Sequence, residues 1–285
     1  MMIVSVKKIP AGRSVVLFFL LVLLGMVIGC GEQAPEKSQA RQTIVVATDT
    51  NLVPMAFVDD QNRLTGFEPD LIKAIAELAG FDIEIVSVAF PGLFGGLITG
   101  KFDLVISSIT ILEERKERMA FSIPYLKSGL ALVVRKDLEG IRSVEDLRDR
   151  KLIAGAQNGT TAYFYLEKYP SLEKKGYDAH GHAVTDLING KIDAVLGEST
   201  GTLYYKNQKK DYFQKIKMVG DILTEEFYGM VLRKEDRELL GKVNRALKKL
   251  LADGTVLKLH TKWDLGNSSV VPATSLGAGP GIDAP

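Results

Sequence analysis

The sequence is poor in the side chains on which most chemistry depends. It has one cysteine, Cys30, one tryptophan and three histidines in 285 residues. A single cysteine excludes a disulfide bond within the chain. His180 and His182 form a pair that is able to contact a metal, but no cysteine or third histidine lies near them. We therefore predict a surface turn at this pair, no metal site and no cofactor.

Catalytic signatures are missing as well. The chain has no Gly-x-Ser-x-Gly elbow, no phosphate-binding P-loop and no HExxH zinc motif. Glu113 and Glu114 are both acidic, but neighbouring side chains on a helix point in different directions and make a poor acid–base pair. These absences predict that the protein is not an enzyme.

The chain also lacks a surplus of charge. Lysine and arginine number 36, aspartate and glutamate number 35, and no long basic block occurs. This balance argues against a nucleic acid as partner. The length exceeds what one small core usually needs, so the sequence predicts two domains or lobes in a chain that we expect to be monomeric.

The N-terminus has no apolar run long enough to cross a membrane. Lys7, Lys8 and Arg13 precede the apolar run 15–28, whereas a spanning helix needs about 20 residues. This order, with Gly29-Cys30 after it, is typical of a secretory signal peptide. Residues 27–30, VIGC, resemble the lipobox of bacterial lipoproteins.

That resemblance implies a signal peptide over residues 1–29 that is removed before Cys30, which then carries a lipid. The alternative is an uncleaved anchor helix. Both place the remaining chain outside the cytoplasmic membrane, in the periplasm or at the cell surface. Residues 30–42 are polar, contain a proline and predict a flexible tether.

From residue 43 onward, apolar runs typical of buried strands alternate with helical patterns, which predicts an α/β fold with parallel sheets. Strands are expected at 43–47, 81–88, 104–106, 129–135, 152–156, 192–196, 216–219 and 227–232. Helix starts are expected at 66–70, where acidic residues complement the helix dipole, at 143–146, which has a capping-box pattern, at 157–161 and after 198. Gly80 is expected to end the first of these helices, and whole helices are expected at 91–100, 185–189, 239–250 and 253–263. Residues 264–285 predict a disordered tail. No internal repeat is evident, although the two halves share an architecture.

Polar residues gather at the ends of the expected strands, where open α/β sheets bind ligands. The candidates are Asp49, Phe90, the stretch Ser107 to Arg115, the turn Gln157 to Thr161, and Glu198. Each also has an interpretation without a ligand. Asp49 is then a turn cap, Phe90 a core ring and Glu198 a surface acid. The stretch Ser107 to Arg115 is then a helix start, and the turn Gln157 to Thr161 a helix cap. Together they supply donors for an anion, carboxylates for a cation and a ring for an apolar stem. This set fits a zwitterionic amino acid, with the guanidinium of Arg115 matching the two oxygens of a carboxylate.

Blocks along the chain resemble the family 3 solute-binding proteins, the polar amino-acid receptors of bacterial ABC importers. The blocks are GFEPDL from 66, SITILEERKERMAFSIPYLKSG from 108, QNGTTA from 157, GKIDAV from 190, FYGMVLRK from 227 and LADGTVLKLHTKW from 251. The resemblance implies a type II periplasmic-binding-protein fold, with two lobes that each hold a mostly parallel sheet flanked by helices. Lobe one would comprise 43–124 and 227–263, lobe two 125–226, and two crossover segments would form the hinge.

The resemblance also implies how the ligand's backbone is held between the closing lobes. Arg115 matches the arginine that grips the α-carboxylate, with Thr110 and the backbone of Ser108 assisting. Thr161 matches a second donor to that carboxylate. Glu198 matches the acid that receives the α-ammonium, where the family more often has aspartate.

Four further positions are implied to contact the ligand's side chain. Phe90 matches a flanking ring, and Leu52 stands where many members carry a second ring. Asp49 and Gln157 match positions that read the side chain, and an acid there suits arginine, lysine, ornithine, histidine or glutamine. The resemblance implies delivery to an ABC permease. Two alternatives stay open: a cyclohexadienyl-type dehydratase with Glu198 as proton donor, and a sensory module that presents its ligand to a receptor.

Overall fold

The computed structural model describes residues 41–202, 214–266 and 269–271. All of them belong to one compact unit. The predicted signal peptide, Cys30, most of the tether and most of the tail lie outside the described residues. Within the described part of the chain, no helix combines the length and the apolar character that crossing a membrane requires.

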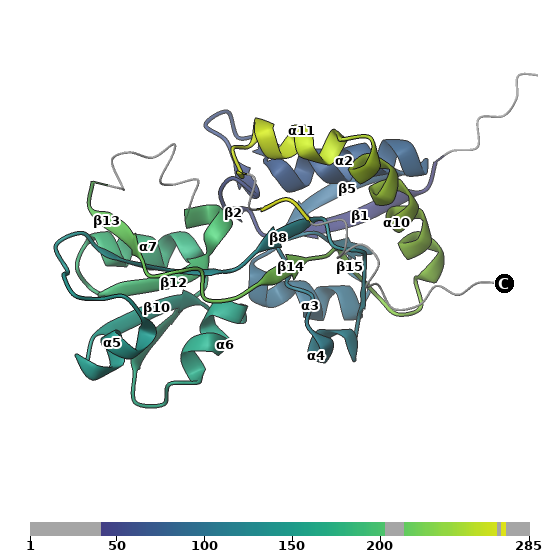
Figure 1. The fold of residues 1–285 in the computed structure, drawn as a ribbon. Coiled ribbons are helices and arrows are strands. Elements are labelled where there is room, and N and C mark those ends of the chain that lie inside the picture. The colour runs from purple at the N-terminus through teal and green to yellow at the C-terminus, as the bar shows by residue number, and fades with distance from the viewer. Residues whose placement is uncertain (1–40, 203–213, 267–268, 272–285) are drawn as a thin grey trace, which may run out of the picture. The chain divides into compact units, whose positions relative to one another are not determined.

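The first of two five-stranded sheets has the predicted apolar strand Thr43–Thr48 inside it. In sheet order the strands are β5 (Asp82–Ser87), β1 (Thr43–Thr48), β6 (Leu104–Val105), β15 (Val231–Leu232) and β7 (Ala120–Phe121). β15 runs antiparallel to both of its neighbours, and the other four strands share one direction. The helices α2 (Phe67–Ala79), α10 (Arg237–Ala252) and α11 (Thr255–Lys262) lie together on one face, and α3 (Phe90–Ile98) lies on the other (Figure 1).

The second sheet repeats this design. In sheet order its strands are β11 (Glu173–Tyr177), β10 (Ile153–Gln157), β12 (Ala194–Glu198), β9 (Leu130–Arg135) and β13 (Ile216–Val219). Here β9 is the reversed strand. The flanking helices are α5 (Val144–Asp149), α6 (Thr161–Glu167) and α7 (His180–Ile188). As predicted, Ser143 opens α5 with a capping box, in which its Oγ accepts from the backbone of Asp146.

A pair of antiparallel strands, β8 (Leu126–Ser128) and β14 (Glu226–Tyr228), carries the chain between the two sheets (Figure 1). The remaining short elements are β2 (Asn51–Leu52), β3 (Ala56–Val58) and β4 (Leu64–Thr65), which form a meander, and α4 (Glu113–Lys116). Two sheets of one design joined by two crossing strands form the predicted fold. The residue at which each lobe begins and ends stays a prediction.

The structure differs from the expected elements at four places. The expected strand 227–232 is two strands in different sheets: β14 pairs with β8, whereas β15 pairs with β6 and β7. The expected helix at 185–189 begins earlier, at His180. Strand β11 was missed because it lies at a sheet edge and is largely charged. Leu265, at the start of the expected tail, is buried in the first core.

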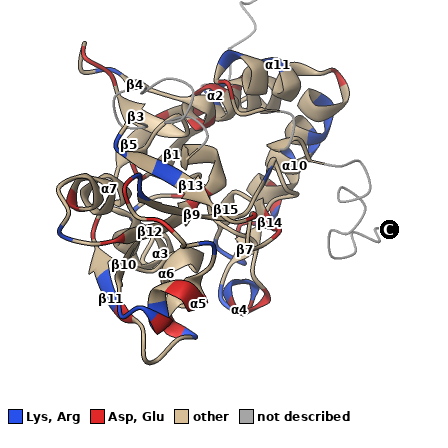
Figure 2. Ribbon diagram, turned by 60° about the vertical axis from the view of Figure 1, so that its left-hand side comes forward, with Lys and Arg blue, Asp and Glu red and all other residues tan. Residues whose placement is uncertain are grey.

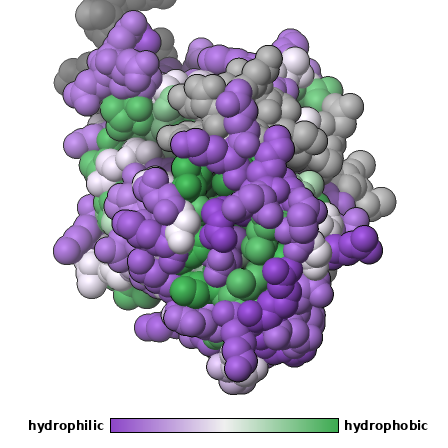
Figure 3. Space-filling view, turned by 90° about the vertical axis from the view of Figure 1, so that its left-hand side faces the viewer, coloured by the Kyte–Doolittle hydropathy of each residue, from purple (hydrophilic) through white to green (hydrophobic). Residues whose placement is uncertain are grey.

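Lysine and arginine gather on two helices, whereas apolar side chains show along the middle of one face. The helices α10 and α11 carry much of the lysine and arginine near the first sheet (Figure 2). The face in Figure 3 is mostly hydrophilic, with apolar side chains showing along its middle. Such a face suits a surface in contact with water.

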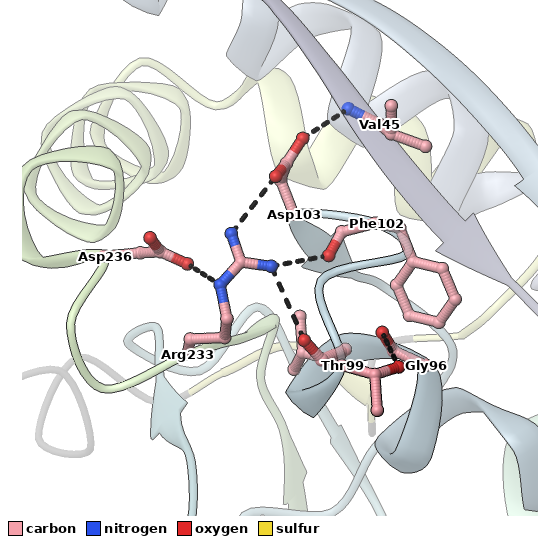
Figure 4. A network of polar contacts seen from close by, with 8 residues as sticks. Val45, Gly96, Thr99, Phe102, Asp103, Arg233 and Asp236 are labelled. Atoms are coloured by element: carbon pink, nitrogen blue, oxygen red, sulfur yellow. Dashed lines mark hydrogen bonds and ion pairs between the residues drawn. The ribbon is translucent and has the colours of Figure 1, made fainter.

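A partly buried network around Arg233 connects the first sheet to its loops (Figure 4). Its guanidinium contacts Asp103 at 3.1 Å and Asp236 at 2.8 Å, and it donates to the carbonyl oxygen of Phe102 at 2.8 Å. The second oxygen of Asp103 accepts from the backbone of Val45 at 3.0 Å. The end of β15 is thereby held to the starts of β1 and β6.

The second sheet contains the same network around Arg135. Its guanidinium contacts Asp193 at 3.0 Å and donates to the carbonyl of Ile192 at 2.7 Å, while Asp193 accepts from the backbone of Ile153 at 2.9 Å. The sequence signal was the pair GKFD at 100–103 and GKID at 190–193. The expectation that no internal repeat is evident is therefore corrected by these matching contacts.

Candidate ligand-binding site

One cavity lies where the strand ends of both sheets approach each other. The space inside it, counted together with open solvent at its mouth, is about 560 Å³. All nine residues that the sequence predicts as ligand contacts line it: Asp49, Leu52, Phe90, Ser108, Thr110, Arg115, Gln157, Thr161 and Glu198. The wall also contains Ser107 and Thr160, which lie within the two candidate stretches. Its remaining residues were not predicted as ligand contacts: Glu68, Ala162, His180, Leu196 and Gly197.

Corresponding strands of the two sheets position the polar residues. Asp49 follows β1 and Gln157 ends β10, while Ser107 and Ser108 follow β6 and Glu198 ends β12. Parallel strands bring their carboxyl ends to one edge, so each sheet presents its polar ends on the side where the cavity lies. The predicted clustering of these residues follows from this topology.

Asp49 is buried and fully occupied by donors. Its Oδ1 accepts from the backbone and side-chain nitrogens of Asn51 at 3.0 and 2.6 Å, and its Oδ2 accepts from the backbone of Phe90 at 3.1 Å. The amide Nε2 of Gln157 donates to the same Oδ2 at 3.0 Å. The two residues that were expected to read the ligand's side chain therefore bond to each other across the cavity.

Arg115 reaches from the first sheet to the second. It donates to the carbonyl oxygens of Thr110 at 3.0 Å and Gly159 at 3.1 Å, and its guanidinium lies 5.1 Å from the ring centre of Phe94. The alternative pairing with Glu114 or Glu117 is not among the ion pairs of the described residues. Two of five N–H groups are used, which leaves three donors for a carboxylate.

Ser108 has a role that the sequence did not indicate. Its backbone adopts φ 50° and its N–H and Oγ both donate to Oε1 of Glu68, at 2.6 and 3.0 Å. Tyr125 donates its hydroxyl to the same oxygen. The expected help of the Ser108 backbone in binding a ligand carboxylate is thus directed at Glu68 in this structure.

Glu68 itself is a buried acid at the cavity wall, with 1% of its surface exposed. Burial raises its pKa to about 7, although the hydrogen bonds from Tyr125 and Ser108 favour the charged form. The sequence indicated only an acidic residue that complements the start of α2. Its burial was not visible because it depends on the packing of β6 and Tyr125 around it.

Glu198 is a second acid with a displaced pKa. It lies half-buried at the end of β12, and its Oε2 accepts a short hydrogen bond from the hydroxyl of Tyr228. Burial, and then the nearby charge of Glu226, raise its pKa to about 8. The Tyr228 hydroxyl also lies 2.8 Å from Oγ of Ser128, so the acid is held at one position.

Thr110 and Thr161 both bond to an acid that sequence reasoning missed. Their hydroxyls donate to Oε2 of Glu226 at 2.7 and 3.0 Å. Glu226 stands directly before the FYG block, which was the one signal available in the sequence. It is buried on β14 behind the cavity wall.

The histidine pair does not form the predicted surface turn. His180 is buried and starts α7 beside the cavity, whereas His182 is exposed. Burial lowers the pKa of His180 to about 4, so it is neutral at pH 7. Among the described residues, no group of three or more His, Cys, Asp or Glu is arranged to hold a metal ion.

Comparisons with known proteins agree with this geometry. The model of the bacterial extracellular solute-binding proteins, family 3, matches residues 44–267. The L-cystine-binding protein TcyJ of Escherichia coli K12 is 30% identical over 229 residues, which cover 80% of this chain and 84% of that protein. The glutamate-binding protein GluB of Corynebacterium glutamicum is 32% identical over 238 residues, 80% of each chain.

Solved structures show the same fold. An ancestral arginine-binding protein bound to arginine superposes with a TM-score of 0.74 at 37% identity, covering 78% of this chain and 98% of that one. The family match spans most of the chain and both sheets. This chain belongs to the bacterial extracellular solute-binding proteins of family 3.

Proposed function

We propose that the protein captures a polar L-amino acid, with a cationic or amide side chain, between its two lobes and delivers it to an ABC permease. The observation that carries this proposal is a guanidinium group and a carboxyl group on the wall of one cavity. Arg115 offers three N–H donors to a carboxylate, and Glu198 offers an acid to an ammonium group. An amino-acid backbone carries these two charges. The relatives named for cystine, glutamate and arginine support the amino-acid class.

The proposal is tested by a thermal-shift screen of the purified protein against the twenty amino acids, ornithine and citrulline. A ligand that binds the folded state raises the melting temperature by mass action. At least one polar L-amino acid is expected to do so. The proposal is overturned if none of these compounds shifts the melting temperature.

Arg115→Ala should abolish the shift. Hydrogen bonds to charged groups contribute about 1.5–3 kcal/mol each, so losing two weakens binding by more than about 100-fold. Arg118→Ala is the matched control, because Arg118 is an exposed arginine just after α4. A shift that survives in Arg115→Ala would mean that the carboxylate is gripped elsewhere.

The cellular location belongs to the same proposal. We infer that Cys30 is lipidated after cleavage of the signal peptide and that residues 30–42 tether the protein to a membrane facing the periplasm or the cell surface. Cys30→Ser should move the protein from the detergent phase to the aqueous phase in a partition assay. Unchanged partitioning would contradict the lipid anchor.

One observation favours a second candidate function. A pKa of about 8 makes Glu198 a proton donor at neutral pH, which a dehydratase acting on a cyclohexadienyl acid requires. Incubation with prephenate or arogenate is the test. Product formation that is lost in Glu198→Gln would establish the enzyme, and no turnover would leave binding as the function.

A further inference from the structure

Glu226 is a buried carboxylate whose side-chain partners among the described residues are all neutral. Its side chain is held by three hydroxyls: Thr110 and Thr161 on Oε2, and Thr224 on Oε1 at 3.0 Å. It is 6% exposed and forms no ion pair within the described residues. A buried charge without an opposite charge in contact costs free energy, so a positive charge nearby is stabilised.

The hydroxyls that Glu226 engages belong to the cavity wall. Thr110 lies beyond β6 and forms an isolated bridge with Tyr228 of β14, whereas Thr161 is the first residue of α6 beside the second sheet. A hydroxyl has a single proton to donate. With both protons directed at Glu226, these two threonines offer only oxygen lone pairs to the cavity, and the grip on a ligand carboxylate is left to Arg115.

The charges around the cavity are unequal. Arg115 is the one cation of the described wall, against three carboxyl groups, Asp49, Glu68 and Glu198. At pH 8 Glu68, with a pKa of about 7, is mostly ionised, and Glu198, with a pKa of about 8, is half ionised. Glu226 adds a fourth acid behind the wall, close enough to act on both Arg115 and Glu198. The backbone of an amino acid is a zwitterion with no net charge, so it does not balance this excess. A positive charge on the ligand's side chain does.

We propose that Glu226 is a specificity-determining positioning residue, which acts from behind the Thr110–Thr161 wall to favour an amino acid with a cationic side chain over a neutral or acidic one. This inference rests on the proposed amino-acid binding. The residue touches no ligand in this role. It acts through the two threonine hydroxyls that it orients and through its charge.

The test compares L-arginine with L-citrulline, which has nearly the same shape and an uncharged side chain, and with L-glutamate. Dissociation constants are measured by calorimetry at pH 8 in low salt for the wild type, Glu226→Gln and Glu225→Gln. Glu225 is the matched control, because it is the adjacent glutamate and its side chain is 64% exposed. We expect the wild type to prefer arginine to citrulline by at least about tenfold, and glutamate to bind more weakly than both.

In Glu226→Gln the preference for arginine over citrulline should shrink by about tenfold, because a charge a few ångströms from the cavity is lost. It should stay unchanged in Glu225→Gln. A merely structural role of Glu226 would weaken both ligands alike and leave their ratio constant. A constant ratio in a variant that melts normally overturns the role of Glu226.

The outcomes separate this inference from the proposed function. A wild type that binds no amino acid overturns both. A wild type that binds citrulline or glutamate as tightly as arginine overturns the inference and leaves amino-acid binding in place. If Glu226→Gln does not fold, Glu226→Asp retains the charge while withdrawing it from the threonines. The ratio should then stay within about twofold of the wild type, and its collapse would overturn the electrostatic role.

Discussion

The two sheets are alike at one edge and different at the other. At the edge where β6 and β12 begin, each sheet has an arginine that bonds an aspartate and a carbonyl oxygen: Arg233 in the first and Arg135 in the second. At the opposite edge the first sheet presents Asp49 and the second presents Glu198. The arginine network therefore occurs in both sheets, whereas the polar residues at the cavity differ between the sheets. Each sheet supplies a different part of the cavity wall.

The difference follows from what each edge has to do. The arginine networks satisfy backbone groups at strand starts, and this task is the same in any sheet of this topology. The cavity edge has to hold an asymmetric ligand, so its two walls differ in charge and in donors. Two sheets with matching arginine networks and unlike cavity walls therefore fit the proposed two-lobed receptor for a zwitterion.

The similarity of the two arginine networks is tested most strongly by replacing the arginine of each network. Arg233→Met and Arg135→Met should each lower the free energy of unfolding by about 2–3 kcal/mol, because each leaves a partly buried aspartate and a carbonyl without its partner. Urea denaturation measures the loss. Arg63→Met is the control, since its side chain is 68% exposed and its pair with Asp59 contributes under about 1 kcal/mol. If the losses of unfolding free energy differ by more than twofold between the two sheets, the two arginine networks are not equivalent.

At the cavity edge, the pH dependence of ligand binding tests the contribution of Glu198, which the second sheet supplies. In the proposed function the ligand's ammonium group binds the ionised form of Glu198, whose pKa is raised to about 8. About 1% of it is ionised at pH 6 and half at pH 8, so affinity for an amino acid should rise by about 50-fold between these values. Calorimetry at pH 6, 7 and 8 measures the rise.

Two variants show which carboxyl group causes the rise in affinity with pH. In Glu198→Gln the rise should disappear, because the side chain no longer ionises. In Glu68→Gln it should persist, although the pKa of Glu68 is also raised, to about 7, since Glu68 bonds to Ser108 and Tyr125. A rise that follows Glu68 would assign the ammonium site to the first sheet instead.

The smallest expected effect concerns the bond that joins the two walls. Asp49→Ala and Gln157→Leu each remove the 3.0 Å hydrogen bond between them, and each should weaken ligand binding by about tenfold. Dissociation constants of the two single variants and the double variant form a cycle. If the shared bond causes both losses, the double variant is little weaker than either single one. Fully additive losses would show that the two residues act separately.

Much of the fold was predictable from local patterns. The apolar run that became β1, the helix that starts after Gly66 and ends at Gly80, and the capping box at Ser143 are all local signals, and each is found where it was expected. The strand β11 and the split at Gly229 were not predictable. The first has no apolar pattern, and the second depends on pairing with strands from distant segments, β8 for β14 and β6 and β7 for β15.

The site was predictable in its members but not in its bonds. All nine expected residues line one cavity, because the ends of parallel strands meet at one edge. The acids Glu68 and Glu226 were missed, because an acid in sequence gives no sign of its burial. Thr110 and Thr161 were expected to serve a ligand, and the structure directs their protons to Glu226.

The sequence by itself determined the family, the order of strands and helices, and the residue types at the strand ends, since these depend on neighbours along the chain. Only the tertiary structure decided which donors meet which acceptors. Asp49 and Gln157 lie 108 positions apart, and Thr110 and Glu226 lie 116 apart. Burial, which raises the pKa of Glu198 to about 8, likewise arises only when the two walls come together.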